Sequence, residues 1–468
     1  MYSISLAVLL LGASCSNTNK NQQQEPTKTF TGAPGEVKLI TLDPGHFHAA
    51  LVQKVSYPQV SKDVYVYAPG GSDLQEHLKK IEGFNTRPDN PTSWNEIVYT
   101  GPDFLEKMLS EKKGNVMVIA GNNSKKTEYI KKTLEAGINV FSDKPMAINT
   151  SSFNMLKECF QIAHQKKVLL YDIMTERNEI TTILQRELSM IPAIYGSQEK
   201  GTPENPAIVT ESVHHFFKVV AGKPLTRPTW YFDVNQEGEG IVDVTTHLVD
   251  LAQWEAFPEQ VIDYTKDIEM VDANRWYTPI SLAQFKECTG ATTFPDFLKK
   301  DIVGDTLRVY ANGDILYKLK GVSTKITVVW KYTYPEGGGD THFSTMRGTK
   351  ANLIIRQGKE QNYKPELFIE TVKGVKTAAY EKELQSSFAG IIAKHPGVEL
   401  KKIKDGVWQV TVPDKYRVGH EAHFGQVMEH FLQYLKDGKL PAWEEPNMIA
   451  KYFVTTKALE MAKAKTQK

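Results

Sequence analysis

Short apolar runs separated by longer amphipathic stretches mark the first third of the chain. Four runs rich in β-branched residues predict buried strands: 37–42, 64–67, 116–120 and 140–141. After the third run, Ile130 and Leu134 share one face of a predicted helix that Gly137 ends. Strands and helices that alternate at this spacing indicate a parallel, doubly wound sheet. Such a sheet binds its ligand at the carboxyl ends of the strands.

The first predicted strand ends in a glycine turn, and a helix is expected to follow it. Strand, turn and helix together present backbone N–H groups to a pyrophosphate. Of the dinucleotide fingerprint G-x-G-x-x-G, only the second glycine is present, as Gly45, while Asp43 and His48 stand at the first and third places. The loop also carries His46 and Phe47, and its two histidines are expected to pack beneath a dinucleotide.

The turns after the next strands supply further candidates for cofactor binding. No carboxylate stands at the end of the second strand, where an acidic ribose ligand is usual. Asp73 is the nearest acidic residue, and Ser72 can contact a ribose or a 2′-phosphate, so NAD and NADP both stay open. The turn after the third strand adds three more candidates: Gly121, Asn122 and Asn123.

Length and composition are those of a globular protein of two domains. The chain has 468 residues, of which 41% are hydrophobic and 24% charged. Its 56 basic and 55 acidic residues leave a net charge of +1 without any long basic run, so no nucleic-acid partner is expected. Cys159 and Cys288 lie far apart without metal-type spacing, and His420 and His423 are read as residues of a helix start. No metal site is predicted.

The N-terminus predicts export. Residues 6–12 form an apolar run too short to span a bilayer, which needs about 20 residues. Small residues and Cys15 follow, which resembles a bacterial lipobox. We therefore expect lipid on Cys15, attachment to a membrane through that lipid alone, and a periplasmic or outer-membrane location. A plain secretory signal or a disordered tail is the alternative, and residues 17–34 have the composition of a tether.

Residues 137–147, Gly-Ile-Asn-Val-Phe-Ser-Asp-Lys-Pro-Met-Ala, resemble the A-G-x-x-V-x-x-E-K-P-x-A signature of the glucose–fructose oxidoreductase/inositol dehydrogenase/MocA (Gfo/Idh/MocA) family. Asp143 takes the place of the usual glutamate. The resemblance implies that Lys144 faces both nicotinamide and substrate hydroxyl, and that Asp143 and Pro145 lie beside the cofactor. An ammonium in that position stabilises a developing alkoxide where water is excluded.

Residues 230–233 and 238–250 resemble a second signature of this family, W-x-x-D followed by G-G-G-x-x-x-D-x-G-x-H-x-x-D. Glu239 and Thr245 replace two of its glycines. With residues 37–353 covered in order, the resemblance implies an α/β protein. Its N-terminal Rossmann domain is a doubly wound parallel sheet, and its C-terminal α+β domain holds a large, mostly antiparallel sheet.

If residues 238–250 are helical, Asp243, His247 and Asp250 share one face, at positions i, i+4 and i+7. An aspartate one turn before a histidine can orient the imidazole, and histidine is suited to proton transfer near neutral pH. The resemblance makes Lys144, Asp243 and His247 the expected catalytic residues. A core histidine with an aspartate partner is the alternative.

Four other residues are secondary candidates for the substrate site. Arg177 either lines that site or fixes the domain junction. His214 and His215 are neighbours on a predicted strand and point to opposite sides, so at most one faces a ligand. Trp230 opens the second signature and is the fourth candidate.

The expected organisation has four parts. They are a leader and tether over 1–34, a dinucleotide-binding domain over 35–172, a substrate and oligomerisation domain over 173–445 with an insertion near 374–412, and a C-terminal helix over 446–468. The helix is expected to pack back on the first domain, as in the family. A homo-oligomer formed through the sheet of the second domain is the expected assembly.

The predicted function is hydride transfer between NAD or NADP and a hydroxyl of a sugar or glycoside, including formation of a 3-keto sugar. Lys144 polarises the oxygen, His247 takes its proton and Asp243 orients His247. Because an exported enzyme lacks a supply of free dinucleotide, the cofactor is expected to be tightly bound. One alternative is an NAD-dependent glycoside hydrolase acting by oxidation and elimination. The other is a non-catalytic carbohydrate-binding lipoprotein, suggested by the incomplete glycine fingerprint.

Overall fold

The computed structural model describes residues 30–220 and 223–466. The predicted leader and Cys15 lie outside these residues. The first domain is a parallel, doubly wound sheet, as predicted, and its six strands have the order β3-β2-β1-β4-β5-β6. Its strands are β1 (Leu39–Leu42), β2 (Asp63–Ala68), β3 (Asn95–Thr100), β4 (Val116–Ile119), β5 (Asn139–Asp143) and β6 (Leu170–Ile173). Its helices are α1 (His48–Leu51), α2 (Ser72–Thr86), α3 (Phe104–Glu111), α4 (Lys126–Glu135) and α5 (Thr150–Lys166).

The apolar runs predict β1, β2, β4 and β5, whereas the buried strand β6 was not predicted. All residues of β1, β4 and β5 are buried, because helices cover both faces of a parallel sheet. The edge strand β3 is mostly exposed, and its short run Ile97-Val98-Tyr99 was not predicted as a strand. The helix expected after the glycine turn is a single turn, α1.

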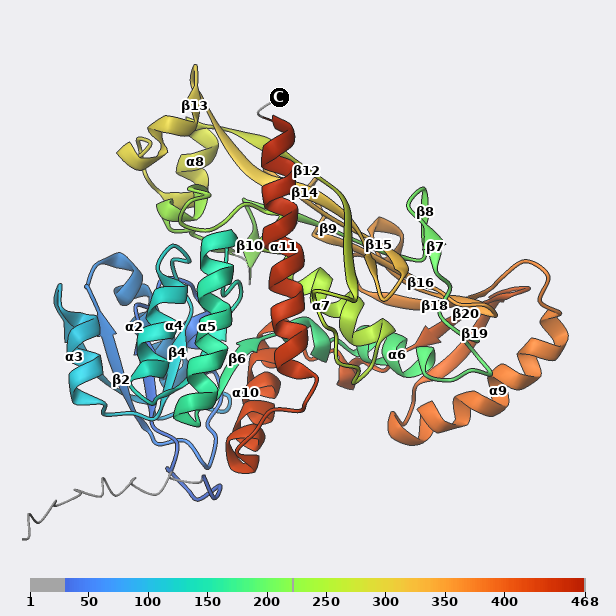
Figure 1. Cartoon of the computed structure of the whole chain (residues 1–468), viewed down its shortest axis with the longest axis horizontal. Coiled ribbons are helices and arrows are strands. Elements are labelled where there is room, and N and C mark those ends of the chain that lie inside the picture. The colour runs from blue at the N-terminus through green and yellow to red at the C-terminus, as the bar shows by residue number, and fades with distance from the viewer. Residues whose placement is uncertain (1–29, 221–222, 467–468) are drawn as a thin grey trace, which may run out of the picture.

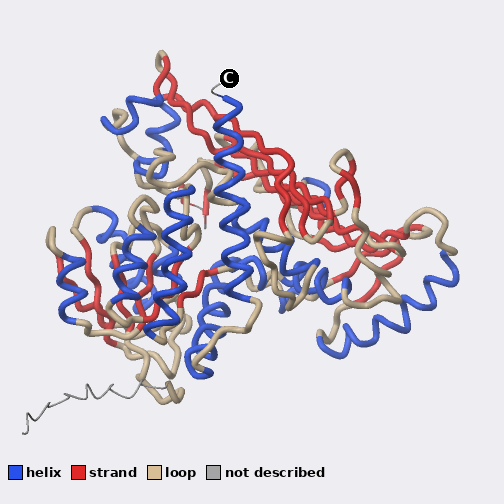
Figure 2. The backbone as a smooth tube through the Cα atoms, in the orientation of Figure 1, coloured by secondary structure: helices blue, strands red, loops and turns tan. Residues whose placement is uncertain are grey.

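The second domain is built on a ten-stranded, mostly antiparallel sheet, again as predicted (Figure 2). Its main strands run in the order β12-β14-β15-β9-β16-β17-β18-β20-β19, and only β15 and β9 pair in parallel. Their bounds are β9 (Ile208–His215), β12 (Ile268–Ser281), β14 (Thr306–Leu319), β15 (Val322–Lys331), β16 (Thr341–Arg347), β17 (Ala351–Gln357), β18 (Glu366–Thr371), β19 (Glu399–Lys404) and β20 (Val407–Thr411).

Short elements complete this domain. The two-residue strands are β7 (Gly201–Thr202), β8 (Asn205–Pro206), β10 (Val219–Val220), β11 (Lys223–Pro224) and β13 (Ile302–Val303), of which β13 pairs with β14. The helices are α6 (Ile180–Ser189), α7 (Thr245–Ala256), α8 (Leu282–Thr289) and α9 (Thr377–Lys394). The segment near 374–412 extends the main sheet, because β20 pairs with β18 and α9 lies beside these strands at the right of Figure 1.

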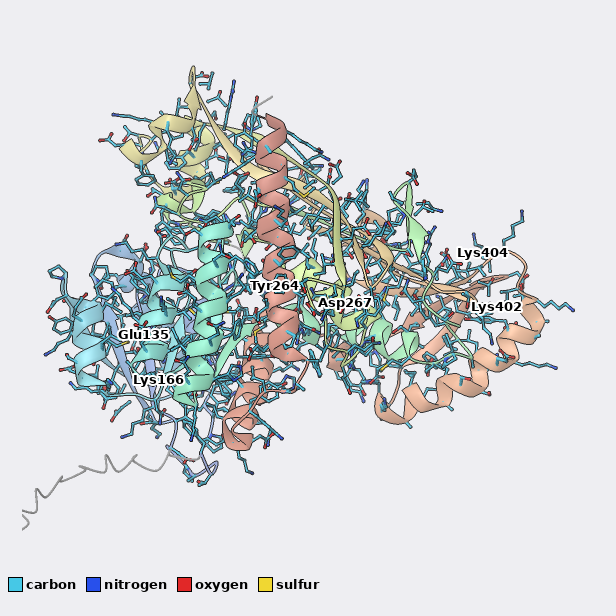
Figure 3. The ribbon with its side chains drawn as sticks, viewed as in Figure 1. Glu135, Lys166, Tyr264, Asp267, Lys402 and Lys404 are labelled. Carbon is cyan, nitrogen blue, oxygen red and sulfur yellow. The ribbon has the colours of Figure 1, made fainter. Side chains whose placement is uncertain are left out.

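Two C-terminal helices, α10 (His420–Asp437) and α11 (Glu444–Thr466), join the domains. In α10, Phe431 stacks on Phe141 of the first domain with 4.8 Å between ring centroids. Helix α11 crosses the middle of the molecule and contacts both α5 and β12 (Figure 1). Tyr264, labelled in Figure 3, packs between Phe153 of α5 and Phe453 of α11. The two domains therefore share buried contacts on both sides of their junction.

Cys159 and Cys288 are both buried and do not form a disulfide. Over residues 30–220 and 223–466, none of the helices has the length and apolar composition required to cross a bilayer.

Candidate active site

A cavity of about 500 Å³ lies at the carboxyl ends of β1, β4 and β5 and reaches residues of the second domain. The loop after β1, the end of β5 and helix α7 all contribute side chains to its wall. Six of the 12 histidines in the chain line it: His46, His48, His214, His247, His342 and His420. A cavity with several convergent polar groups at this edge of a doubly wound sheet is the expected place for ligand binding.

Lys144 and Asp243 form a buried ion pair in the wall of this cavity. Lys144 follows directly after β5, and its Nζ lies 2.5 Å from Oδ1 of Asp243. The side chains are only 11% and 6% exposed. Burial on its own would lower the pKa of Lys144, but the charges of Asp243 and Asp143 raise it above its ordinary value. The lysine therefore presents a full positive charge to the cavity at neutral pH.

The partner of Asp243 differs from the one that the sequence predicts. Helix α7 begins at Thr245, so Asp243 lies in the turn before it, and the backbone N–H of His247 donates to the carbonyl of Val244 at 3.0 Å. Asp243 is thus not one turn before His247 on a regular helix, and its carboxylate contacts Lys144 instead of the imidazole. The prediction that Asp243 orients His247 is wrong for this structure.

His247 is a half-buried, neutral imidazole, and its Nδ1 points away from solvent. Its Nδ1 is buried and makes no hydrogen bond to the part of the chain that the structure describes. Burial and then the nearby Lys144 ammonium lower the pKa of His247 to about 4. At neutral pH the ring is uncharged, so it can accept a proton from a ligand in the cavity.

Asp250 does not share the cavity with His247. Its two carboxylate oxygens accept hydrogen bonds from Arg177, at 2.6 and 2.7 Å, and Lys451 also donates to it, at 2.7 Å. Arg177 further binds Glu444 at 2.8 Å. Arg177 therefore joins α7 to α11 at the domain junction, which is the second of its two predicted placements. The expectation of one shared face for Asp243, His247 and Asp250 is wrong.

The loop after β1 lies close to the loop after β4. A Cβ on Gly121 would lie 2.6 Å from the carbonyl oxygen of Asp43, so only glycine permits this approach. Gly45 and His46 both donate their backbone N–H to the carbonyl of Ala120, at 3.1 Å. Burial and then Asp73 raise the pKa of Asp43 to about 6. The amides of Gly45 and His46 are thus used within the protein.

Asp73 and Trp230 cover Gly45 from the other side. Nε1 of Trp230 donates to Oδ2 of Asp73 at 2.8 Å, and a Cβ on Gly45 would lie 3.1 Å from that oxygen. Ser72 is the first residue of α2, next to Asp73. Asp73 therefore holds its carboxylate beside the glycine loop, in the first helical turn after β2, which ends at Ala68. In this fold the end of that strand carries the acidic ribose ligand.

The remaining predicted residues fall into two groups. Phe47, Gly121, Asn123 and His214 line the cavity, whereas Asn122, Pro145, His215 and Trp230 do not. Asn122 and Asn123 hydrogen-bond to residues 236 and 237, which ties the β4 loop to the second domain. His214 and His215 differ in burial, and both lie near Asp340. Nδ1 of His215 lies 2.9 Å from Oδ1 of Asp340.

Several cavity residues were not predicted from the sequence. Glu176 lies in the 3₁₀ turn η1 (Thr175–Asn178), and His342, Asp340, Trp330 and His420 come from distant parts of the chain. Burial would raise the pKa of Glu176, but the nearby imidazoles, His420 and His247 first, lower it. No local pattern distinguishes these residues from surface ones.

Two family models match the chain. One is described as "Oxidoreductase family, NAD-binding Rossmann fold" and covers residues 74–172, and the other as "Putative oxidoreductase C terminal domain" and covers residues 184–463. A solved structure from Parabacteroides merdae ATCC 43184, titled as a "putative oxidoreductase", is 74% identical, with 94% of this chain and 100% of that chain covered and a TM-score of 0.93. The chain belongs to the Gfo/Idh/MocA family of oxidoreductases.

More distant Gfo/Idh/MocA-like structures share the fold. A levoglucosan dehydrogenase solved with NADH and levoglucosan is 11% identical, with 92% of this chain and 97% of that chain covered and a TM-score of 0.59. A 3-ketoreductase from Actinomadura kijaniata, solved with NADP and TDP-benzene, is 12% identical, with 89% and 95% covered and a TM-score of 0.54. No curated protein matches the chain.

The residues present fit a dinucleotide of this family. Gly121 lacks the Cβ that would separate the two loops, Asp73 offers a ribose ligand, and the unpartnered imidazole of His247 lies in the same cavity as the Lys144 ammonium. The Rossmann match begins at residue 74, beyond the first loop, in agreement with the incomplete fingerprint around Gly45.

Proposed function

We propose that the protein is an NAD(P)-dependent oxidoreductase that acts on a hydroxyl of a sugar or glycoside. One observation carries the proposal: a charged ammonium, Lys144, and a neutral imidazole free to take a proton, His247, line the same cavity at the edge of a dinucleotide-binding sheet. Acid–base side chains beside a bound nicotinamide are what alcohol oxidation requires.

The chain's own residues divide the work as follows. Lys144 binds the substrate oxygen and stabilises the negative charge that develops on it. His247 accepts the hydroxyl proton. Asp243 holds the Lys144 ammonium in place and keeps it charged, in place of the orienting role first expected for it. The nicotinamide, when bound, supplies the hydride acceptor or donor. In the reverse direction His247 returns the proton to the same oxygen.

A sugar-like substrate is supported by polar side chains that several strands contribute to a cavity wall that is otherwise mostly apolar. Ser212 and His214 on β9, Thr341 and His342 on β16, and Gln357 on β17 all line it. Hydroxyl, imidazole and amide groups spread over several strands suit a ligand with many hydroxyl groups. The distant fold neighbours that act on levoglucosan or are named as 3-ketoreductases support the same class.

The experiment measures absorbance at 340 nm after purified protein, NAD or NADP and a panel of sugars and glycosides are mixed. The expected result is a sugar-dependent rise that Lys144→Met and His247→Gln abolish. Lys62→Met, at an exposed lysine, is the matched control and keeps the activity. A lack of any change with every sugar, together with a lack of bound dinucleotide, would favour the non-catalytic alternative.

A second candidate is glycoside hydrolysis by oxidation, elimination of the aglycone, addition of water and reduction of the ketone by the hydride that the first step removed. Glu176 favours it, since this ionised carboxylate lines the cavity and its side chain makes no hydrogen bond within the described residues. After a ring hydroxyl is oxidised, the neighbouring C–H becomes acidic, and Glu176 is placed to serve as the second base that elimination needs. Aryl glycosides separate the candidates: cleavage releases the phenol, whereas simple oxidation leaves a stable keto-glycoside.

Tight cofactor retention belongs to the same proposal. The sequence predicts export, and an exported enzyme would need to keep its dinucleotide through many turnovers. Mass spectrometry of protein purified without added nucleotide is expected to find about one NAD or NADP per chain, which would also identify the cofactor. Protein that is free of nucleotide and regains activity only with added NAD would contradict retention.

A further inference from the structure

A compact group of metal-ligand atoms lies in the wall of the cavity. His46 and His48 come from the loop after β1, and Asp143 is the last residue of β5. Nδ1 of His48 lies 3.0 Å from Oδ2 of Asp143, and Nδ1 of His46 lies 3.7 Å from the same oxygen. One ligand atom from each residue lies within 4.8 Å of the other two.

One of these ligand atoms lacks a partner although it is buried. Nδ1 of His46 has no hydrogen bond to any described residue, and its nearest carboxylate oxygen is beyond hydrogen-bond distance. A buried polar atom without a partner is costly, and most such atoms in proteins are satisfied. The three side chains are only 17%, 9% and 5% exposed, and all three line the cavity. The site is therefore screened from bulk water but open to a ligand.

The donor set and spacing suit a particular class of ion. First-row transition metals bind imidazole nitrogen and carboxylate oxygen at about 2.0–2.2 Å, which places neighbouring ligand atoms roughly 3.0–3.6 Å apart. The two distances to Asp143 Oδ2, 3.0 and 3.7 Å, fall at or just outside that range. Mg²⁺ and Ca²⁺ prefer sites made of oxygen alone.

We propose that His46, His48 and Asp143 bind one divalent first-row transition-metal ion, with Zn²⁺ as the simplest case. Three protein ligands leave coordination positions open, as in catalytic zinc sites. Those positions face the cavity, so hydroxyl oxygens of a bound ligand can complete the coordination. This site departs from the sequence analysis, which predicts no metal, and it does not depend on the proposed function.

Two ammonium groups near the site do not occupy the ligand position. Lys144 is paired with Asp243 at 2.5 Å. Lys126 donates to the backbone carbonyl of Asp143, at 3.1 Å, and not to its carboxylate. Its Nζ also lies 3.5 Å from the backbone carbonyl of Lys144. Neither lysine therefore forms an ion pair with the Asp143 carboxylate.

The experiment uses the full chain, stripped with a chelator, dialysed and titrated with Co²⁺, which reports on its ligands through visible absorption. The expected result is one Co²⁺ per chain with a ligand-field band between about 500 and 650 nm, displaced by Zn²⁺. His46→Gln and Asp143→Asn are expected to weaken binding at least tenfold. The control His164→Gln, at an exposed histidine, and His342→Gln, elsewhere in the cavity, are expected to bind as the wild type does.

Two outcomes would overturn the metal site. One is a folded wild-type chain, checked by circular dichroism, that binds no stoichiometric Co²⁺. The other is unchanged Co²⁺ binding in both His46→Gln and Asp143→Asn. Lys144→Met separates this proposal from the proposed function, because it should abolish hydride transfer and still bind Co²⁺.

Discussion

Two buried ionic regions lie beside helix α7 and the turn before it. They differ in how many of their polar groups have a hydrogen-bond partner. Around Asp250, both carboxylate oxygens take short hydrogen bonds from Arg177 and Lys451. At the cavity, Lys144 and Asp243 are paired, but Nδ1 of His247 and Nδ1 of His46 have no partner among the described residues. A closed network holds elements together, whereas unused donors and acceptors beside a cavity are available for a ligand.

The first way to test this difference is to break the closed network. Arg177→Met leaves Asp250 and Glu444 buried without their main partner, so we expect a loss of about 3–5 kcal/mol in the free energy of unfolding. Urea denaturation followed by circular dichroism measures it. Lys318→Met, which breaks an exposed pair with Glu269, is the control and should cost less than about 1 kcal/mol. Equal losses of unfolding free energy in Arg177→Met and Lys318→Met would show that the network around Asp250 stabilises the fold no more than an exposed ion pair does.

The second change acts on the open region. Lys144→Met is expected to lower kcat/KM about 10²–10³-fold, since it removes the group that stabilises charge on the substrate oxygen. The variant also leaves the buried Asp243 carboxylate without its partner, so we expect a loss in the free energy of unfolding as well, although Asp243 lines the cavity and Asp250 does not. Steady-state kinetics and urea denaturation on the same preparation measure both. Near-normal kcat/KM would show that Lys144 does not contact the reacting oxygen.

Asp243→Asn tests the corrected role of that residue. The charge of Asp243 raises the pKa of Lys144, so its removal lowers that pKa and the ammonium is lost at a lower pH. We expect about a tenfold fall in kcat/KM at neutral pH and an alkaline limb of the pH profile that moves toward neutrality. If Asp243 instead served His247, the acidic limb would move and the alkaline limb would not.

The smallest expected effect is on the pH dependence of stability. Burial lowers the pKa of His48, His247 and His342 to about 4, below the value near 6.5 of an unfolded chain. Between these values the unfolded chain binds more protons, so the free energy of unfolding falls as the pH drops from about 6.5 toward 4. The slope measures how many more protons the unfolded chain binds than the folded one, and His342→Gln should reduce that number by close to one. Urea denaturation at several pH values measures it, and an unchanged slope would mean that His342 is protonated in the fold.

The sequence predicted what depends on local periodicity and motif order. The strands β1, β2, β4 and β5 have apolar runs, and the segment around Lys144 and the one around His247 stand in the order of the family. The buried strand β6 is interrupted by Asp172 and the exposed edge strand β3 has only a short apolar run, and both were missed. The helix start at Thr245 is set by a preceding turn that periodicity does not show, so the partner of Asp243 was predicted wrongly.

The rest of the cavity depends on tertiary contacts that no local pattern encodes. Glu176, His342 and His420 are far apart in the sequence, and only the packing of η1, β16 and α10 brings them to one wall. Arg177 and Glu176 are adjacent, yet the first closes the domain junction and the second lines the cavity. Both residues lie in the single 3₁₀ turn η1, and the sequence does not show which of their side chains that turn directs toward the cavity.

A crystal structure of the protein with its dinucleotide and a reactive sugar tests the central claim most directly. The account predicts one sugar oxygen within hydrogen-bond distance of both Lys144 Nζ and the His247 ring, with the carbon that bears it facing the nicotinamide. A sugar bound away from either side chain, or a nicotinamide seated outside the cavity, would contradict it.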